Sequence, residues 1–516
     1  MKGLKVLETA GLFALLLSPT AAEPIGASAG RNAASPDVAA SPTPAPAPRR
    51  LPAPEAVWLN GKPFPQVVAS APHLSAAHRT FFAEPGTAAG DGSEAAPWSD
   101  LQAALRQLQP GDRLRVRAGE YSVALQIDES CQNGTRQEPI QIVFDGKAEL
   151  TPNGDSAILT ITRAHWVIVG LYAKLSDSKA PAVSIEGAGS HDVMLEQVRI
   201  SGGKVAAVFI GAASQHVTID NSRISKEHLE EPGRDAVGVR IAAGARNILL
   251  RNNHLHENPA GSVRIDAPAR SGLRARDIQI VDNTISGDGS TAIAVAAADG
   301  LRITGNTISD ATGGDTRCLT LDDVRRAVVR SNHFSHCALA MRIGQVDPDA
   351  GVRGHADDVS IDHNFLESAL PGGTAVDIEA GEGVRFANNV IQGYSDGITV
   401  FGKPPSTKGV TIANNLWLSV SRTAFMIQDP QSADLFDYNV FSPQGEILTA
   451  EVGHNSLPLT QFLKEGTMPH TRVVPNVQVL NRDLGRISGV ETANRGTAIE
   501  GIGSHAGAPA LGVAER

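Results

Sequence analysis

The chain repeats a short pattern of apolar and polar positions from about residue 219 onward. Each unit has an apolar residue, two polar or small residues, an asparagine, any residue, and another apolar residue, as in LRNNHL, ITGNTI and VRSNHF. Units follow one another at intervals of 23 to 32 residues. The aligned positions are Ser222, Asn253, Asn283, Asn306, Asn332, Asn364, Asn389, Asn415 and Asn439.

Each unit holds two or three strands of four to five residues with turn residues between them, and no crossover helix. A unit this short cannot bury its own apolar side, so successive units must stack with their strands in parallel. The pattern therefore predicts an all-β fold, a single right-handed parallel β-helix. We expect the asparagines to tolerate left-handed backbone at tight turns and to bond from coil to coil, a structural role.

The first part of the chain divides into three predicted segments before this β-helix. Residues 1–22 have two lysines, an apolar stretch and small residues at the end, as in a secretory signal peptide. Residues 23–57 are rich in Pro and Ala and are expected to form an extended linker, and 58–97 lead into the fold. The β-helix with its two caps takes up 98–516, and its folded body is expected to begin near Phe81. The apolar spacing of 98–109 predicts an amphipathic capping helix, followed by a strand in DRLRVRAGEY.

Composition narrows the class of protein further. The chain has 516 residues and is 41% apolar but only 4% aromatic, with 51 glycines, which suits narrow strands and many turns. Its net charge of −10 disfavours nucleic acid as a partner. No stretch after residue 22 is long and apolar enough for a transmembrane helix, so we expect an exported protein, periplasmic or extracellular. Cys318 and Cys337 lie 19 residues apart, and whether they form a disulfide is open; Cys131 is left over.

A second strand precedes each asparagine unit, and its middle residue is expected to point outward because the residues on either side are apolar. Two residues further on, the same face continues with Asp266, Asp322 and Glu379. One face would thus carry three arginines and four carboxylates. Aligning these strands gives an outward column of Ser184, Phe209, Arg240, Arg264, Ala294, Thr320, Arg342, Asp377, Thr399 and Met426.

Three long insertions, 225–236, 267–277 and 345–358, flank this strand. Insertions on one side of a solenoid usually build its binding face. We therefore predict a groove with Arg240, Arg264 and Arg342 on its floor. Further arginines (Arg270, Arg274 and Arg276) would form one wall. Guanidinium groups in a row suit an anionic polysaccharide, because each can hold a carboxylate with two hydrogen bonds. An ordinary solvated face with internal ion pairs is the alternative.

Several segments resemble secreted pectate-lyase-like right-handed parallel β-helix proteins. They are GDGSEAAPWSDLQAALRQLQPGDRLRVRAGEY, NGTRQEPIQIVF, the asparagine units and the closing GAPALG, so the resemblance covers about 80–510. It implies the fold strongly. It leaves the reaction open, because such proteins include polysaccharide lyases, uronan epimerases, glycosidases and non-catalytic repeat proteins.

Motifs of the individual branches are only partly present. Asp347-Pro348-Asp349 resembles the DPH motif of mannuronan epimerases but lacks the histidine. The pair Asp322-Asp323 resembles that of polygalacturonases, whose Gly-His-Gly and Arg-Ile-Lys segments are missing here. MRIG at 341–344 echoes only the arginine of the alginate-lyase and chondroitinase-B-like branch.

The preferred hypothesis is an enzyme, a lyase that cleaves a uronic-acid polysaccharide by β-elimination. Arg264 and Arg342 would neutralise the substrate carboxylate, and Arg240, His256 or His228 would act as the base. Asp266, Asp322, Asp377, Glu379 and Arg274 are candidate substrate-binding residues. Calcium is a candidate cofactor at Asp347 and Asp349, with Asp357 and Asp358 as further oxygen ligands.

Three alternatives remain open. A uronan C5-epimerase could use the same fold. A glycoside hydrolase could use Asp377 and Glu379, whose side chains should stand about 7 Å apart, within the range of inverting enzymes. A non-catalytic polysaccharide-binding or surface-structural solenoid is the third alternative.

Overall fold

The computed structural model describes residues 58–59, 62–63, 76–88, 90–152, 154–175, 178–226, 236–268, 273–287, 289–309, 316–347, 351–368, 372–402, 404–443, 448–466, 468–475, 477–481 and 486–488. The predicted signal peptide (1–22) and linker (23–57) lie outside these residues and stay predictions.

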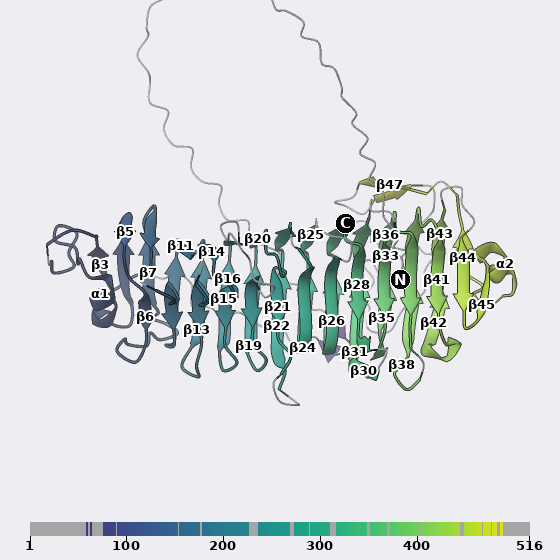
Figure 1. Ribbon diagram of the computed structural model, residues 1–516, viewed down its shortest axis with the longest axis horizontal. Coiled ribbons are helices and arrows are strands. Elements are labelled where there is room, and N and C mark those ends of the chain that lie inside the picture. Colours follow the sequence, from purple (N-terminus) through teal and green to yellow (C-terminus); the bar gives the residue numbers. More distant parts are fainter. Residues whose placement is uncertain are drawn as a thin grey trace, which may run out of the picture. The chain divides into compact units, whose positions relative to one another are not determined.

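The parallel strands form three rows, called A, B and C here, and the chain runs through the rows in turn (Figure 1). Row A contains β6 (Leu125–Ile127), β9 (Leu159–Ile161), β12 (Val183–Ile185), β15 (Ala206–Ile210), β18 (Val237–Ile241), β21 (Val263–Ile265), the first parts of β24 (Thr291–Thr304) and β26 (Arg317–Arg330), β28 (Leu339–Ile343), β33 (Thr374–Ile378), β37 (Asp396–Val400), β41 (Thr423–Ile427) and β44 (Thr449–Val452).

Row B follows row A in each coil, and β24 and β26 continue from one row into the other. It contains β3 (Arg79–Ala83), β4 (Asp112–Val116), β7 (Ile140–Phe144), β10 (Trp166–Val169), β13 (His191–Glu196), β16 (Gln215–Asp220), β19 (Arg246–Arg251), β22 (Ala275–Val281), the second parts of β24 and β26, β31 (Ala356–Asp362), β34 (Gly381–Glu382), β35 (Arg385–Ala387), β38 (Thr407–Lys408), β39 (Val410–Ala413) and β42 (Ala433–Asp437).

Row C closes each coil and forms a separate 14-stranded sheet. It contains β5 (Gly119–Tyr121), β8 (Ala148–Leu150), β11 (Tyr172–Leu175), β14 (Arg199–Gly202), β17 (Arg223–Ser225), β20 (His254–His256), β23 (Thr284–Ser286), β25 (Thr307–Ser309), β27 (His333–Ser335), β32 (Phe365–Glu367), β36 (Val390–Gln392), β40 (Leu416–Leu418), β43 (Val440–Ser442) and β46 (Arg472–Val473).

The remaining strands pair antiparallel, β1 (Trp58–Leu59) with β2 (Lys62–Pro63), β29 (Gln345–Asp347) with β30 (Gly351–Gly354), β45 (Asn455–Pro458) with β44, and β47 (Gln478–Asn481) with β48 (Arg486–Ser488). Near the last coil lie a short 3-10 helix (Pro430–Ser432) and α2 (Leu459–Lys464). Inward residues of the three rows meet in one continuous apolar core. The predicted right-handed parallel β-helix is confirmed.

A helix, α1 (Leu101–Gln107), stands beside the first coils. The predicted helix 98–109 was too long at both ends. The Asp100 side chain accepts a hydrogen bond from the backbone N–H of Ala103, which sets the start of the helix. Leu101, Ala104 and Leu105 point into the core. The segment expected to be one strand, DRLRVRAGEY, forms β4 and β5 in two different rows.

The repeating asparagines stack in one buried row, as predicted. The backbone N–H and Nδ2 of each asparagine before Asn439 donate to Oδ1 of the asparagine in the following coil, at 2.9 Å each from Asn306 to Asn332. Nδ2 also donates to a main-chain carbonyl of the preceding coil, as Asn332 does to Ile303 at 2.9 Å. The row begins at Ser222 and ends where Asn439 donates to the Thr471 hydroxyl.

The predicted left-handed backbone of these asparagines is wrong by one position. Positive φ belongs to the preceding residue, for example Asn252 at 55° and Ser331 at 54°, and not to Asn253 or Asn332. That residue turns the chain between rows B and C and leaves the following asparagine to point inward. The turn residue can therefore vary, whereas the stacked asparagine is set by its hydrogen bonds.

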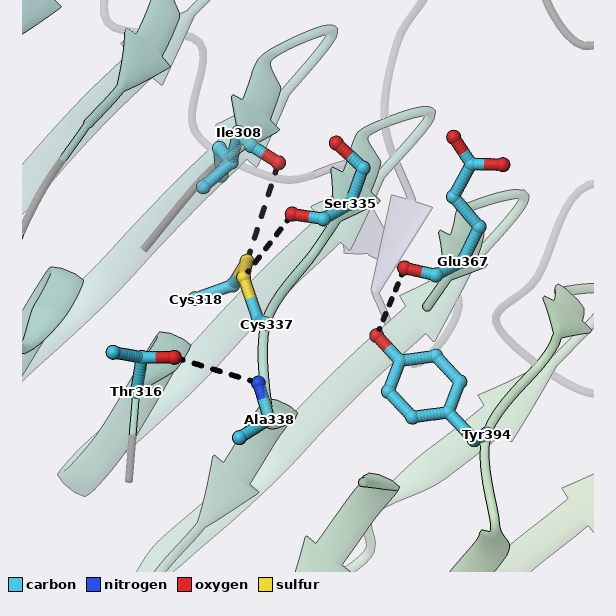
Figure 2. Close-up of a disulfide and its surroundings, with 8 residues drawn as sticks. All are labelled: Ile308, Thr316, Cys318, Ser335, Cys337, Ala338, Glu367 and Tyr394. Carbon is cyan, nitrogen blue, oxygen red and sulfur yellow. Dashed lines mark hydrogen bonds between the residues drawn. A yellow bond between two sulfur atoms is a disulfide. The ribbon is translucent and has the colours of Figure 1, made fainter. Parts of the chain in front are cut away.

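Cys318 and Cys337 form a disulfide, which the sequence left open (Figure 2). Their Cα atoms lie 5.8 Å apart and both residues are fully buried. Cys318 is at the start of β26 and Cys337 follows β27, so the bond joins the beginning and end of one coil. Beside it, the N–H of Ala338 donates to the Thr316 hydroxyl at 3.5 Å. Cys131 is a free, buried cysteine.

Loss of this disulfide is expected to destabilise the fold by about 3 kcal/mol, because closing a 19-residue loop lowers the entropy of the unfolded chain. The measurement is the denaturant midpoint of the wild type and of a Cys318→Ser/Cys337→Ser variant, each with and without reductant. Only the wild-type midpoint should fall when reductant is added. An unchanged wild-type midpoint would contradict the expectation.

Within the residues that the structure describes, no helix combines the length and the apolarity that crossing a bilayer requires.

Candidate functional site

The outward column predicted from the sequence is confirmed by the strand register of row A. Arg240 pairs with Arg264, and Arg342 pairs with Asp377 on the next coil. Ala294 and Thr320 separate the two pairs. The flanking residues of each strand, such as Val239 and Ile241, are fully buried, so alternation directs the middle residue outward. We call the seven residues Arg240, Arg264, Asp266, Asp322, Arg342, Asp377 and Glu379 the arginine–carboxylate face.

The two arginines of the first pair share one carboxylate. Nε of Arg240 donates to both oxygens of Asp266 at 2.9 and 3.1 Å, and Nε of Arg264 lies 4.0 Å from the same group. Asp266 follows β21 directly, which places it beside both guanidinium groups. The side chains of Arg240 and Arg264 are 34% and 42% exposed, so both remain open to a ligand from solvent.

Arg342 pairs with a different carboxylate, and its side chain is more buried than those of Arg240 and Arg264. Its Nη2 donates to Oδ1 of Asp322 at 2.7 Å. Burial raises the pKa of Asp322, and the neighbouring Arg342 opposes that rise. Nε of Arg342 is buried without a hydrogen-bond partner. A guanidinium group has five N–H donors, so the ion pair leaves donors for a further acceptor.

Asp377 differs from the other carboxyl groups of the face. Burial raises its pKa to about 6, opposed by a hydrogen bond with Thr399 and reinforced by the negative charges of Glu379 and Asp396. A carboxyl group with such a pKa can gain or lose a proton near neutral pH. Its register partner Arg342 places a positive charge one coil away.

Glu379 has a structural partner. It follows β33, and its Oε2 accepts a hydrogen bond from the backbone N–H of Val346 at 2.9 Å. Val346 lies in the hairpin β29–β30, which is formed by the insertion 345–358. Glu379 therefore ties this insertion to the arginine–carboxylate face.

In chain order, each insertion lies between a strand of row A and a strand of another row. The segments 267–277 and 345–358 connect rows A and B, and 225–236 connects rows C and A. Arg274 reaches forward to Asp323, with Nη2 at 2.5 and 2.6 Å from the two carboxylate oxygens. Arg276 pairs with Arg246 and Asp299 in row B, so it belongs to that row.

The structure does not bring His256 to this face. His256 lies in β20 of row C and its side chain is buried, whereas all three arginines belong to row A. Asp357 and Asp358 lie in row B, where Asp357 contacts His355 and Arg325. The side chain of Asp347, together with His228, Arg270 and Asp349, falls outside the described residues, so the calcium hypothesis stays a prediction.

Sequence reasoning missed Arg317. Burial raises the pKa of both Asp322 and Asp377, and the positive charge of Arg317 opposes both rises. Arg317 lies three residues before the column position Thr320 and pairs with Leu339 on the next coil. Extending the alignment three residues upstream would have revealed it.

A separate open hollow of about 470 Å³ is lined by Lys147, Tyr172, Gln197 and Arg199 and includes none of the face's residues.

The face therefore carries charges of both signs, and not an uninterrupted positive row. Three arginines meet four carboxylates, and Asp266 and Asp322 act as partners of the arginines. These pairs fix the direction of the guanidinium groups in advance of a ligand. The arrangement can hold a polar or carboxylated ligand and place Asp377 as a proton-transfer group beside it.

Comparisons with known proteins agree on the fold. The family model described as "Right handed beta helix region" matches residues 268–417. No curated protein matches the sequence significantly. Among solved structures, the PL6 family alginate lyase AlyGC has a TM-score of 0.56 and 16% identity, covering 84% of this chain and 57% of that one.

Two further solved structures have lower TM-scores against this chain. The pectate lyase Pel9A has a TM-score of 0.38 and 15% identity, covering 85% of this chain and 97% of that one. The A-module of the mannuronan C-5 epimerase AlgE6 from Azotobacter vinelandii has a TM-score of 0.44 and 12% identity, covering 60% and 92%. The likeness to the alginate lyase, at 16% identity, shows the fold alone. The chain is a right-handed parallel β-helix protein, and the expected likeness to pectate-lyase-like proteins holds at the level of architecture.

Proposed function

We propose that the chain is a polysaccharide lyase that cleaves a uronic-acid-containing polymer by β-elimination at the arginine–carboxylate face. The observation that carries the proposal is the position of Asp377, a carboxyl group with a pKa of about 6, next to Arg342 in the same row. The solved alginate lyase of the same fold suggests the substrate class.

In this proposal Asp377 removes the proton on the carbon next to the substrate carboxylate. The electron pair forms a C=C bond, the C–O bond of the glycosidic link breaks, and the leaving oxygen takes a proton from solvent. Arg342 neutralises the substrate carboxylate, whose negative charge grows as the proton leaves. Arg264 lies three coils before Arg342 and would hold the carboxylate of another sugar unit of the same polymer. Asp377 replaces His256 as the proposed base, because His256 lies in another row.

Hydrolysis is the second candidate, and one observation favours it. Asp377 and Glu379 are two positions apart at the end of β33, and the negative charge of Glu379 helps to raise the pKa of Asp377. A carboxylic acid with a raised pKa beside an ionised carboxylate is the arrangement that glycosidases use. An unsaturated product would support the lyase, and new reducing ends without unsaturation would support the hydrolase.

We further propose that the protein is exported. The predicted signal peptide supports this, and the Cys318–Cys337 bond is of a kind that persists mainly in oxidising compartments. Secretion of the full chain, with cleavage after residue 22 detected by N-terminal sequencing, is the direct test.

The function is tested with alginate, pectate, glycosaminoglycans and bacterial exopolysaccharides, each with and without chelator. The wild type should generate an ultraviolet-absorbing unsaturated end on one uronan. Arg342→Ala should lower turnover by about 10²–10³-fold, because it removes a charge that stabilises the transition state. Arg264→Ala, three coils away, should mainly raise KM, because it removes a contact to another sugar unit.

The matched control is Arg115→Ala, which breaks a half-exposed arginine–aspartate pair in row B and should leave turnover unchanged. Full activity in Arg342→Ala and Arg264→Ala, with circular dichroism unchanged, would rule out this face as the active site. Loss of activity with chelator that calcium restores and zinc does not would add calcium to the proposal, with Asp347 and Asp349 as the first ligands to replace.

A further inference from the structure

Three histidines and one aspartate gather in row B on the coils of β10, β13 and β16. His165 directly precedes β10, His191 and Asp192 begin β13, and His216 is the second residue of β16. The register places His165, Asp192 and His216 at the same position in three successive coils. The arginine–carboxylate face lies in row A on later coils, so this cluster is separate from it.

One carboxylate oxygen stands at the centre of the cluster. Oδ2 of Asp192 lies 2.7 Å from Nδ1 of His191, 4.0 Å from Nδ1 of His165 and 4.0 Å from Nδ1 of His216. Ligand atoms of His165, His191 and Asp192 all lie within 4.8 Å of one another. Tetrahedral zinc with bonds of about 2.0–2.1 Å needs ligand atoms about 3.3 Å apart, so small side-chain rotations suffice.

Two further features point to a ligand in this place. Nδ1 of His165 is buried and has no hydrogen-bond partner, although it faces the Asp192 carboxylate. A buried polar atom of this kind is normally satisfied, and a metal ion would satisfy it. In addition, the amide of Asn247 lies 3.1 Å from Nε2 of His216. With its oxygen toward the ring, that amide would accept the Nε2–H and leave Nδ1 free to coordinate.

We propose that His165, His191 and Asp192, with His216 as a fourth ligand, bind a divalent transition-metal ion. Imidazole nitrogens with a single carboxylate suit zinc, nickel or copper, whereas calcium and magnesium prefer sets of oxygen ligands. The side chains of His165 and Asp192 are 18% and 15% exposed, and those of His191 and His216 are 34% and 39% exposed. An ion can therefore enter from solvent.

Such an ion would join three successive coils near the start of the β-helix. It would bind the folded chain and not the unfolded one, because the ligands come from coils 24 to 27 residues apart. Binding of this kind raises the melting temperature with metal concentration. The site acts as a clamp on these coils, independently of any activity in row A.

The probe is zinc chloride, titrated calorimetrically into the full chain without a polyhistidine tag after treatment with EDTA, with zinc content measured by mass spectrometry. We expect one zinc ion per chain and a melting temperature that rises with zinc. His165→Gln and Asp192→Asn should each weaken binding by at least about 100-fold, since even outer-sphere partners are worth 10–100-fold.

The matched control is His470→Gln, which removes a histidine that pairs with one carboxylate, Asp437, and should leave zinc binding unchanged. The double variant His191→Gln/His216→Gln, at the two more exposed positions, serves if a single variant fails to fold. The proposal would be overturned if the wild type bound no stoichiometric zinc. It would also be overturned if the variants of His165, Asp192, His191 and His216 all bound zinc as tightly as the wild type.

Discussion

Replacing Asp377 by asparagine is expected to lower turnover on the polymer that the wild type degrades by about 10²–10⁴-fold, the usual value of a general acid or base. The substitution keeps the size of the side chain and an oxygen that can accept the Thr399 hydrogen bond, so the fold should persist. The expectation holds for β-elimination and for hydrolysis, because both assign proton transfer to Asp377. Steady-state kinetics on the identified substrate is the measurement.

The raised pKa of Asp377 also predicts opposite effects of the same variant on activity and on stability. Its pKa is about 6 in the folded chain against 3.8 as the ordinary value, so ionisation destabilises the fold above about pH 6. That cost disappears as the pH falls from 6 toward 3.8. Asp377→Asn should therefore stabilise the protein by roughly 1–3 kcal/mol near pH 7.5 and by little near pH 4.

As a base, Asp377 must be ionised, so wild-type turnover by elimination should rise as the pH rises through about 6. Asp145→Asn, at an ion pair in row B, is the control for both measurements. A variant that is inactive and also less stable at neutral pH would indicate a structural role for Asp377 and would contradict the assignment.

Replacing Asn332 by alanine is expected to destabilise the protein by roughly 3 kcal/mol. The change removes the acceptor of two donors of Asn306, at 2.9 Å each, and the donor to the carbonyl of Ile303. All of these groups are buried, and an unsatisfied buried group costs about 1–3 kcal/mol. The measurement is the free energy of unfolding in urea.

Asn455→Ala, at an exposed position in β45, is the matched control and should change stability by no more than about 0.5 kcal/mol. A cost for Asn332→Ala as small as that of the control would show that the stacked asparagines contribute little to stability.

The fold was predictable because the sequence carries two periods at once, the two-residue alternation within each strand and the repeat of the coils. Alternation within a strand decides which residue points outward, and the coil repeat decides which residues become neighbours. Arg240 and Arg264, or Arg342 and Asp377, thus become register partners although 24 and 35 residues separate them. The asparagine row was predictable for the same reason. The left-handed residue before it was not, because residues as different as Asn252, Ser331 and Tyr438 fill that position.

The charge pairing of the site could not be read from the sequence. Asp266 lies two residues after Arg264 but also pairs with Arg240 on the preceding coil, a choice that depends on side-chain rotamers. The hydrogen bond of Glu379 to Val346 depends on the path of an insertion. Burial, which raises the pKa of Asp377, is likewise a property of packing.

The histidine cluster left a signal that was overlooked. Two of its three coils precede the coil of Ser222, where the asparagine units begin, so the alignment of these units stopped too early. His165, Asp192 and His216 follow one another at intervals of 27 and 24 residues, within the range of the coil repeat. Extending the same period toward the N-terminus would have brought them together.

The asparagine row also limits how this architecture can change in length. Every side-chain amide oxygen in it accepts from the coil before, so the hydrogen bonds between the amides have one direction, from Ser222 at the start to Thr471 at the end. Removing part of a coil would break the chain of amides. Excising the segment between two equivalent positions, such as Asn283 and Asn306, would remove one whole coil and leave two asparagines that can pair in the same way. Proteins with this architecture can therefore lengthen or shorten by duplication or loss of entire coils, because the buried asparagine row then stays continuous.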